Sequence, residues 1–304
     1  MSLKITIIIL NWNGAKDTIE CINSIENIKN VSYDILVVDN GSEQDDYLEL
    51  KNKFPEIKLI RSEKNLGFTG GNNLGIEYAM NSNPDYFLLL NNDTTVESDF
   101  IDYLLGVFDK YKNAGIAAPR INYYNEPKKI WSEGGKISRF RGSGFAYSER
   151  YEKKIETEYK SVTFVSGCCM LIKREVIDKI GLFDINYFLY VEDTDLCKRT
   201  LDAGYKIYVA YKSKIYHKVS NSTKGNLSGL PLYYVTRNRL YFSKKNFSNT
   251  YFVAFIYIFT TMLIKSITWI FSYKTNNIAL VRRAFFDFFN GNMGEVNKAN
   301  LKTK

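Results

Sequence analysis

The first candidate for chemistry is a polar cluster that follows an apolar run near residue 90. Tyr86 to Leu90 is short and continuously apolar, which is typical of a buried parallel strand, and Asn91, Asn92 and Asp93 come directly after it. Open α/β sheets bind ligands at the carboxyl ends of their strands. One carboxylate with amide oxygens beside it suits a hard divalent cation that also takes oxygens from a phosphorylated substrate. Taken alone, however, such residues more often simply form a turn.

A second group of acidic side chains, Glu192, Asp193 and Asp195, begins a stretch with helical spacing that runs to about Ala203. Acidic residues there are stabilised by the positive end of the helix dipole, so helix capping is the structural alternative to a catalytic role. The only histidine, His217, follows a strand-like run, and a lone histidine is more often structural than a ligand. The roles of both positions therefore depend on the elements around them.

Four apolar runs, which we expect to be strands, alternate with stretches of helical spacing at residues 4–10, 33–38, 57–60 and 86–90. The loops that follow them contain, in order, Asn11 with Asn13, Asp39, the glycine-rich residues 67–75, and Asp93. This alternation predicts right-handed βαβ units and a mostly parallel sheet, whose loops converge on one edge. Gly70 and Gly71 would precede a helix and let its N–H groups face an anion. The glycine spacing matches neither a P-loop nor the dinucleotide-binding fingerprint.

The rest of the chain has a different character. After Pro119 the regular alternation ends, and residues 131–147, rich in glycine, arginine and aromatics, predict a loop or hairpin. We expect a catalytic domain over residues 1–228, divided into halves at 1–119 and 120–228, and a basic, aromatic helical region over 229–304. Within that region residues 251–273 are long and apolar enough to cross a bilayer, although Lys265 lies well inside the stretch.

Charge and cysteine content limit the kinds of partner and the cellular compartment that we expect. Residues 198–304 carry 18 Lys/Arg and 3 Asp/Glu, a net charge of +15, whereas the whole 304-residue chain is +8, so residues 1–197 are at −7. The basic part could meet nucleic acid, anionic lipid or a phosphorylated substrate. The four cysteines have neither metal-ligand nor disulfide spacing and predict buried thiols in a reducing compartment. The first residues lead directly into a strand without a secretory signal pattern, so we expect the chemistry on the cytoplasmic side.

Four blocks, taken together and in order, resemble the nucleotide-sugar half of family-two glycosyltransferases, and within that family the rhamnosyltransferase branch. They are residues 7–14 (IIILNWNG), 37–42 (VVDNGS), 65–73 (NLGFTGGNN) and 89–93 (LLNND), and the resemblance extends over about residues 3–245. It implies a GT-A fold, which is α/β and Rossmann-like, with a mostly parallel sheet and helices on both faces. It also implies a hexosyltransferase that uses a nucleotide-sugar donor.

The resemblance carries residue roles with it. Asp39 would accept the N3–H of uracil or thymine, and the backbone near Asn11 and Trp12 would frame the base. Asp93 and His217 would hold Mg²⁺ or Mn²⁺, although Asn91 replaces the first acid of the family's Asp-x-Asp element. The remaining donor-side residues are Asn65, Gly70, Gly71, Asn72 and Asn92.

On the acceptor side, the block from Phe183 to Arg199 is similar to the family's Glu-Asp element, in which the Asp is the catalytic base. That residue is Asp193, while Glu192 would orient the acceptor or a loop and Asp195 would cap the helix. A base opposite the leaving nucleotide gives displacement with inversion, and proton removal contributes typically about 10²–10⁴-fold. Arg237, in a segment common in this branch, could clamp the diphosphate or could equally belong to a solvated helix face.

These observations predict an inverting, metal-dependent glycosyltransferase that moves a dTDP- or UDP-activated sugar, with rhamnose suggested by the branch, to a lipid-linked saccharide for a cell-surface polysaccharide. We expect peripheral docking on the cytoplasmic face of an anionic membrane and no nucleic-acid partner. The alternatives are a single membrane span near 251–273, helices packed on the catalytic domain, or a homo-oligomer. The rival functions are transfer to a polyprenyl phosphate and a non-catalytic nucleic-acid- or membrane-binding protein.

Overall fold

Four parallel strands form the N-terminal part of a central sheet in the computed structural model, which describes residues 3–43, 45–147, 150–152, 157–219 and 229–296. They are β1 (Ile5–Asn11), β2 (Tyr33–Asp39), β3 (Lys58–Arg61) and β4 (Tyr86–Asn91), in the order β3-β2-β1-β4. Apolar side chains on both faces of β1 are buried, because helices cover both sides of the sheet. The expected parallel arrangement is confirmed here.

The helices divide between the two faces of this sheet. On one face α1 (Ala15–Ile25), α2 (Asp46–Lys53) and α4 (Phe100–Lys110) contribute to a shared hydrophobic core. On the other face α3 (Gly67–Met80), α5 (Arg174–Ile180) and α6 (Glu192–Asp202) form a second core. Every second side chain of β1 faces each layer, which is the period-two alternation of a strand buried on both sides.

Beyond β4 the sheet becomes mixed. The strand β12 (Cys169–Lys173) lies antiparallel between β4 and β6 (Ala114–Tyr123), and β13 (Lys206–His217) runs parallel to β6. After an irregularity in its pairing with β6, β13 also pairs with the short β5 (Thr94–Val96). On the other side of β6 lies β7 (Lys129–Ser132), which pairs with β10 (Arg150–Tyr151), and β11 (Tyr159–Val162) pairs with β13. Because β5 begins one residue after Asp93, its pairing with β13 brings His217 to the end of β4.

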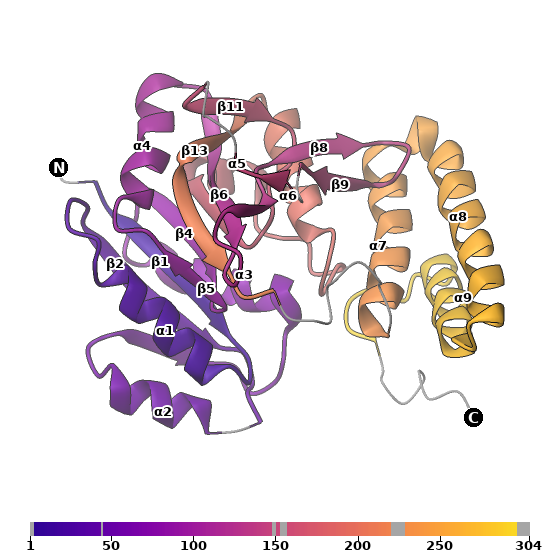
Figure 1. The fold of residues 1–304 in the computed structure, drawn as a ribbon, viewed down its shortest axis with the longest axis horizontal. Helices are drawn as coiled ribbons and strands as arrows, with labels where there is room; N and C mark the ends of the chain where they lie inside the picture. Colours follow the sequence, from indigo (N-terminus) through magenta and orange to yellow (C-terminus); the bar gives the residue numbers. More distant parts are fainter. Residues whose placement is uncertain (1–2, 44, 148–149, 153–156, 220–228, 297–304) are drawn as a thin grey trace.

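The expected excursion near residue 140 is a hairpin of β8 (Gly135–Ser138) and β9 (Ser143–Ala146). It reaches from the sheet toward α7 (Leu230–Asn246), as Figure 1 shows. Gly142 has φ +63°, and a Cβ there would lie 2.3 Å from Ser243 Oγ and 2.8 Å from the Arg239 carbonyl oxygen of α7. A glycine at the hairpin tip therefore permits close packing on α7.

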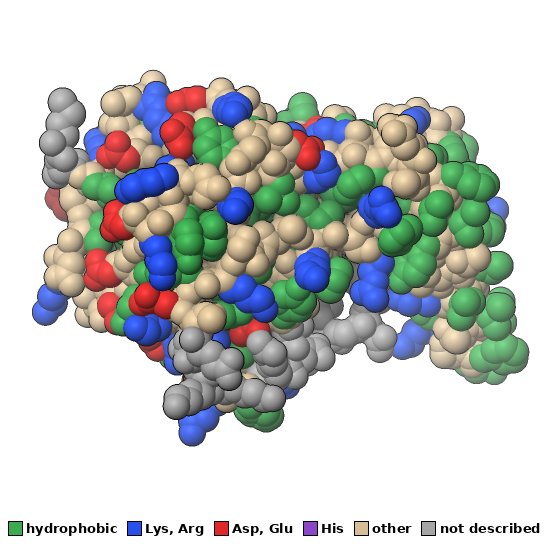
Figure 2. All heavy atoms as spheres, turned by 90° about the horizontal axis from the view of Figure 1, so that it is seen from above, with side chains coloured by type: hydrophobic (Ala, Val, Ile, Leu, Met, Phe, Trp, Pro, Cys, Tyr) green, Lys and Arg blue, Asp and Glu red, His purple; other side chains and the backbone are tan. Residues whose placement is uncertain are grey.

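The C-terminal helices form a layer of their own at one end of the molecule. After α7 come a 3₁₀ turn (Ser248–Thr250), α8 (Tyr251–Phe271) and α9 (Thr275–Phe289), and α7 lies between the sheet and the other two helices. By length and composition Ser248–Phe271 could cross a membrane, and only 17% of its most apolar window is buried. Figure 2 shows apolar side chains gathered over this end, while acidic side chains gather over the other. The predicted division after residue 228 falls beside residues 220–228, which lie outside the described part, and stays a prediction.

Candidate active site

Most of the predicted site residues lie along one edge of the sheet. The pairing of β1 with β2 places Asn11 opposite Asp39, and the pairing of β1 with β4 places Leu10 opposite Asn91. On the far side of β4, Leu90 lies opposite Cys169, so the start of β12 reaches the same edge. Because neighbouring strands are about 4.8 Å apart, the edge from β2 to β12 extends about 14 Å.

Asp39 lies at one end of this edge and is fully buried. Its Oδ1 accepts hydrogen bonds from Ser42 Oγ at 2.5 Å and from the Ser42 N–H at 3.3 Å. Its Oδ2 forms an ion pair with Arg61 Nε at 3.2 Å and accepts no hydrogen bond within the described residues. The carboxylate is therefore held rigidly with one oxygen still able to accept a proton donor. Trp12 is 46% exposed, so its ring is accessible.

The side chain of Asn11, in contrast, is used within the protein. Its amide group donates to Asp46 Oδ2 at 3.0 Å and to Ser42 Oγ at 3.2 Å, and its Oδ1 accepts from Thr18 Oγ1 at 2.7 Å. Asp46 also accepts the N–H groups of Gly14 and residue 15 at the start of α1. Sequence reasoning missed Asp46, and the signal that could have found it was the glycine at the N-cap position of α1, which offers no side-chain cap.

The glycine-rich loop differs from its expected form. The helix α3 begins at Gly67, so Gly70 and Gly71 lie within its first turns rather than before it. A Cβ on Gly71 would lie 2.4 Å from Leu10 Cδ1, and the Gly70 N–H donates to the Leu66 carbonyl oxygen. Gly71 therefore allows the helix to pack closely on β1, and the expected approach of the Gly70 and Gly71 backbone to an anion is not supported.

The two asparagines of this loop also have partners inside the protein. Asn65 Oδ1 accepts the N–H of Gly67 at 2.7 Å and the amide of Asn40 at 3.2 Å. The Asn72 amide donates to the Phe68 carbonyl oxygen at 2.8 Å. Both side chains stabilise the start of α3, and their expected contact with the donor stays a prediction.

Asp93 and His217 meet at the end of β4, although 124 residues separate them. His217 Nε2 and Asp93 Oδ2 are 3.1 Å apart. The other two polar atoms, Asp93 Oδ1 and His217 Nδ1, are buried and have no hydrogen-bond partner within the described residues. The ring of Trp131 packs edge-on against the imidazole at 4.6 Å between centroids. A carboxylate and an imidazole side by side, each with an unpartnered atom, fit a divalent cation that completes its shell with phosphate oxygens and water.

The described part of the chain holds no group of three or more such ligands, so the protein alone would supply only part of a coordination shell. The side chain of Asn92, for which we expect a contact with the donor, has partners within the protein. Its amide donates to Thr18 Oγ1 at 3.0 Å and lies 3.4 Å from the Gly14 carbonyl oxygen, so Asn92 connects the end of β4 to the start of α1.

Asp193 lies in the first turn of α6, at the β12 end of the same edge. Its Oδ2 accepts the N–H of Gly167 at 3.1 Å and its Oδ1 accepts the N–H of Thr194 at 2.6 Å. The residue after Gly167 is Cys168, whose carbonyl oxygen accepts the N–H of Asn91 at 2.9 Å. A short series of contacts thus connects Asp193 to the residues next to Asp93, and the two carboxylates share one end of the β4–β12 pair.

Burial raises the pKa of Asp193 above its ordinary value, and the N–H groups of Gly167 and Thr194 partly oppose that effect. Glu192 beside it is buried, and its Oε2 has no hydrogen-bond partner within the described residues. Burial and the neighbouring Asp193 together raise the pKa of Glu192 well above its ordinary value. A carboxyl group with a raised pKa is a better proton acceptor once ionised, as a general base requires.

The backbone that leads into α6 is strained. Phe188, Tyr190 and Val191 have φ values of 60°, 70° and 75°, a region that side chains with a Cβ rarely adopt. Each such residue costs of the order of 1–3 kcal/mol, so the surroundings must hold it in place. The Asn238 amide of α7 does so by donating to the carbonyl oxygens of residues 187, 189 and 190 at 2.8–2.9 Å. Sequence reasoning missed Asn238, because its partners lie about 50 residues away.

The structure corrects the role suggested for Arg237 as a diphosphate clamp. Its side chain is fully buried, and its guanidinium donates to Asn238 Oδ1, to Tyr233 Oη and to backbone carbonyl oxygens that include that of Gly294 at 2.8 Å. It is neither a solvated helix residue nor free to reach a ligand. Arg237 ties α7 to the segment before α6 and to the chain after α9.

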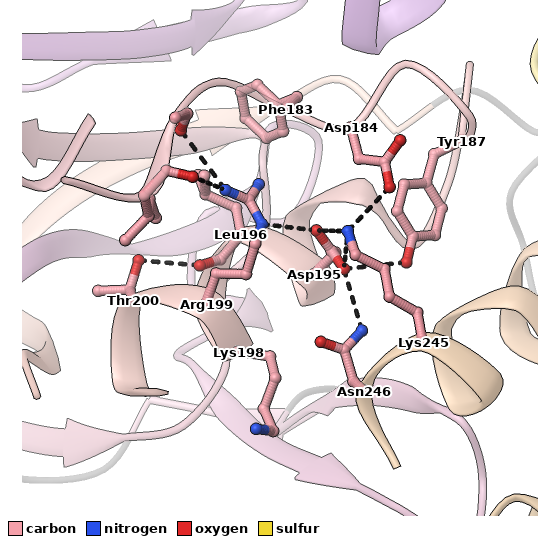
Figure 3. A network of polar contacts seen from close by, with 12 residues as sticks. Phe183, Asp184, Tyr187, Asp195, Leu196, Lys198, Arg199, Thr200, Lys245 and Asn246 are labelled. Atoms are coloured by element: carbon pink, nitrogen blue, oxygen red, sulfur yellow. Dashed lines mark hydrogen bonds and ion pairs between the residues drawn. The ribbon is translucent and has the colours of Figure 1, made fainter. Parts of the chain in front are cut away.

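Asp195 is likewise not a helix cap. Figure 3 shows its fully buried carboxylate surrounded by donors from several elements. They are Tyr187 Oη at 3.1 Å, Arg199 Nε at 2.8 Å, Lys245 Nζ at 3.0 Å and Asn246 Nδ2 at 3.0 Å. Lys245 and Asn246 are the last residues of α7. Asp195 thus provides a second link between α7 and the helix that carries Asp193.

A family model gives this geometry a context. Residues 6–181, more than half of the chain, match the model described as Glycosyl transferase family 2. The chain belongs to this family. It is therefore a glycosyltransferase, an enzyme. This membership argues against the alternative of a non-catalytic binding protein, which the basic C-terminal region alone did not exclude.

Two curated relatives are named for rhamnosyl transfer. The chain is 26% identical over 217 residues to N-acetylglucosaminyl-diphospho-decaprenol L-rhamnosyltransferase of Mycobacterium tuberculosis, a match that covers 64% of this chain and 70% of that protein. It is 25% identical over 257 residues to the dTDP-rhamnosyl transferase RfbF of Shigella flexneri, covering 81% of this chain and 82% of the relative. The glycosyltransferase is thus rhamnosyltransferase-like, as expected.

Solved structures agree on the fold. The structure of GalNAc-T7 with UDP, GalNAc and Mn²⁺ superposes with a TM-score of 0.62 at 18% identity, covering 78% of this chain and 47% of that one. The chain thus spans about half of that protein. S. aureus TarS residues 1–349 superpose with a TM-score of 0.54 at 14% identity, covering 81% of this chain and 66% of that chain. The predicted GT-A fold is confirmed.

Proposed function

We propose that this glycosyltransferase moves a sugar with inversion from a dTDP- or UDP-sugar to a hydroxyl of a lipid-linked saccharide. Rhamnose is the sugar we propose, since one relative is named a dTDP-rhamnosyl transferase and the other an L-rhamnosyltransferase whose name includes a diphospho-decaprenol. The observation that carries the proposal is the meeting of Asp93 with His217 on the edge that Asp193 also reaches.

In this proposal the donor lies along the edge from β2 to β4. Oδ2 of Asp39, which accepts no hydrogen bond within the described residues, would accept the N3–H of the nucleotide base, and the exposed ring of Trp12 would lie beside that base. Asp93 and His217 would hold Mg²⁺ or Mn²⁺ against the diphosphate. Such an ion, when bound, stabilises the charge that develops on the leaving group. GalNAc-T7, which shares this fold, was crystallised with UDP and Mn²⁺, and this supports a divalent ion here.

Asp193 acts as the base. The acceptor oxygen attacks the anomeric carbon while its proton passes to the Asp193 carboxylate. The bond from that carbon to the donor phosphate oxygen breaks, and its electron pair leaves with the nucleoside diphosphate. Because the base lies at the β12 end of the edge and the nucleotide at the β2 end, attack comes from the face opposite the leaving group. Glu192 would orient the acceptor beside Asp193.

We further propose that the enzyme docks peripherally on the cytoplasmic face of an anionic membrane, with a single span as the alternative. Residues 229–304 carry 11 Lys/Arg and 2 Asp/Glu. Much of the outer surface of α8 is apolar and exposed, including Phe252, Leu263 and Phe271. A basic surface beside exposed aromatic and aliphatic side chains suits the headgroup region of anionic lipids.

A transfer assay tests the proposal. Purified enzyme is given dTDP-rhamnose, UDP-glucose or UDP-N-acetylglucosamine, together with a prenyl-diphosphate-linked N-acetylglucosamine acceptor, with Mn²⁺ or with EDTA. We expect a product of inverted anomeric configuration from dTDP-rhamnose that depends on the metal. A prenyl monophosphate in place of the saccharide should give no product. Product only from the monophosphate would show that the acceptor is the lipid phosphate itself.

A further inference from the structure

The β8–β9 hairpin connects α6, the helix that carries the proposed catalytic base Asp193, to the exposed apolar helix α8. One residue after the start of β9, the Gly144 N–H donates to Thr194 Oγ1 at 3.1 Å, and Thr194 is the residue after Asp193. At its tip Gly142 packs on α7, and a Cβ there would lie 3.4 Å from Ile258 of α8. The hairpin thus extends from the first turn of α6 to the C-terminal helices (Figure 1).

Three arginines gather at the tip of this hairpin. Arg139 and Arg141 are exposed and stack over the rings of Phe140 and Phe145. Arg239 of α7 donates through Nε to the Arg141 carbonyl oxygen at 2.7 Å. The contacts of the three guanidinium groups are with aromatic rings and this carbonyl oxygen, and no carboxylate of the described residues is among them.

This lack of counter-charge sets the cluster apart from nearby cations. Lys245 of the same helix pairs with two carboxylates, and Arg283 of α9 pairs with Asp287. Burial and the positive charge of Arg141 lower the pKa of Arg239 to about 10. Positive groups that lie close together without a carboxylate are stabilised by a bound anion, and the effect is larger for a partly buried group such as Arg239. Guanidinium groups favour phosphate because they can donate two parallel hydrogen bonds to it.

The position of the cluster indicates which phosphate. Gly144 contacts Thr194 beside the proposed catalytic base, and Arg141 lies three residues before Gly144, in the turn of the hairpin. Three residues span at most about 10 Å, a distance that a short saccharide can bridge. On the other side, Arg239 lies over the ring of Tyr257 in α8. Ile264 and Phe271 follow Tyr257 at intervals of seven residues, so the three share a helix face, and all are exposed. The exposed apolar face of α8 therefore begins beside Arg239.

We propose that Arg139, Arg141 and Arg239 bind the diphosphate of a prenyl-diphosphate-linked acceptor, with its saccharide pointing toward Asp193 and its prenyl chain along the Tyr257–Ile264–Phe271 face. The proposal rests on the function proposed above, and specifies where the lipid-linked acceptor lies. It makes the three arginines determinants of acceptor specificity rather than catalytic residues.

Direct binding tests the site without requiring catalysis. Binding of farnesyl diphosphate is measured by titration calorimetry to the full chain, to Arg139→Glu/Arg141→Glu, and to Lys51→Glu/Lys53→Glu, which makes the same charge change on exposed residues of α2. We expect saturable binding to the wild type, weakening of at least about tenfold in the hairpin variant, and no change in the α2 variant. If the hairpin variant does not fold, Arg139→Gln/Arg141→Gln replaces it.

Three results of that titration would overturn the inference. They are absence of binding to the wild type, equal weakening in both variants, and binding of inorganic diphosphate as tight as that of farnesyl diphosphate, which would indicate a site for free phosphate only.

Transfer kinetics distinguish a failure of the proposed diphosphate site from a failure of the proposed function. The hairpin variant should raise the KM for a prenyl-diphosphate-linked saccharide at least about tenfold, but leave transfer to a phosphate-free alkyl glycoside of the same sugar unchanged. Equal loss on both acceptors would contradict the assignment. If the wild type binds farnesyl diphosphate at these arginines yet transfers no sugar to any acceptor, the proposed function fails while the binding site stands.

Discussion

The two ends of the sheet edge that carries the candidate site hold their carboxylates in different ways. Asp39 is fixed by residues at neighbouring strand ends, with Ser42 only three residues away. Asp193 follows a backbone segment with three left-handed non-glycine residues, and that segment is held by Asn238 of α7. The contacts that hold Asp39 therefore all come from the first hundred residues, whereas the segment before Asp193 is held in place only once α7 has packed.

This difference gives α7 a role beyond packing. One of its sides contacts α6 through Asp195, Lys245 and Asn246, and α8 and α9 pack on it as well. A change that loosens α7 should disturb the acceptor side of the reaction and leave donor binding intact. The predictions below test that separation, beginning with the largest expected effect.

Replacing Asp193 with Asn should reduce transfer by at least about 10²-fold, because the amide cannot accept the acceptor proton. Donor affinity, measured by titration calorimetry with Mn²⁺ and dTDP-rhamnose, should stay within twofold of the wild type, as expected for a residue outside the nucleotide end. Asp202→Asn, at the exposed end of the same helix, is the matched control and should remain active. Full transfer by the Asp193 variant would refute the base assignment.

At the proposed metal position, Asp93→Ala should weaken Mn²⁺-dependent donor binding by at least about tenfold, because one of the two proposed protein ligands is lost. The measurement is the thermal shift produced by donor with and without Mn²⁺, since ligand binding to the native state raises stability. Asp34→Ala, at the opposite end of β2, controls for the loss of a surface carboxylate. An unchanged metal-dependent shift in the Asp93 variant would count against the site.

Asn238→Ala and Ser42→Ala compare the two ends directly. Loss of the Asn238 amide leaves buried carbonyl oxygens unsatisfied and should lower the free energy of unfolding by about 1–3 kcal/mol. It should also lower kcat with little change in the KM for the donor, whereas Ser42→Ala should raise that KM with little change in kcat. Steady-state kinetics and denaturant unfolding provide both measurements. The same kinetic pattern from the two variants would show that the ends are not separate.

The smallest expected effect concerns pH. The pKa of Glu192 is raised in the folded protein, so above its ordinary value of 4.5 the unfolded chain has lost a proton that the native state still holds. The native state then binds more protons, and stability falls as pH rises from 4.5 until the raised folded pKa is passed. Glu192→Gln should remove this decline, seen as a smaller difference in the thermal midpoint between pH 5 and pH 8. An equal decline in both proteins would contradict it.

The sequence predicts the N-terminal half of the site better than the half that depends on the C-terminal helices. The sequence predicts the parallel strands, the polar residues at their ends and the pairing of Asp93 with His217. Each strand and the loop after it form one continuous stretch of sequence, and the family resemblance relates motifs that lie far apart in the chain. The roles expected of Arg237, Asp195 and Gly70–Gly71 are not supported, because their partners are chosen by packing between distant segments. The residues next to Arg237 in the sequence do not distinguish a buried arginine that donates to carbonyl oxygens from one that faces a ligand.

Some important residues could not be assigned from their own neighbours in the sequence. Asp46 caps α1 from a neighbouring helix, and Asn238 supports a segment about 50 residues before it. The three arginines around the hairpin come from two elements that only the fold brings together. Such positions follow from where elements pack, which periodicity and spacing do not determine.

The most direct test of a single site that joins Asp39, Asp93 and Asp193 is a crystal structure of Asp193→Asn soaked with Mn²⁺ and an unhydrolysed nucleotide-sugar, since this variant should bind the donor without consuming it. We expect the metal between Asp93 and His217, the nucleotide base beside Asp39, and the anomeric carbon facing residue 193. A nucleotide bound elsewhere, or a sugar whose anomeric carbon faces away from residue 193, would contradict the single site.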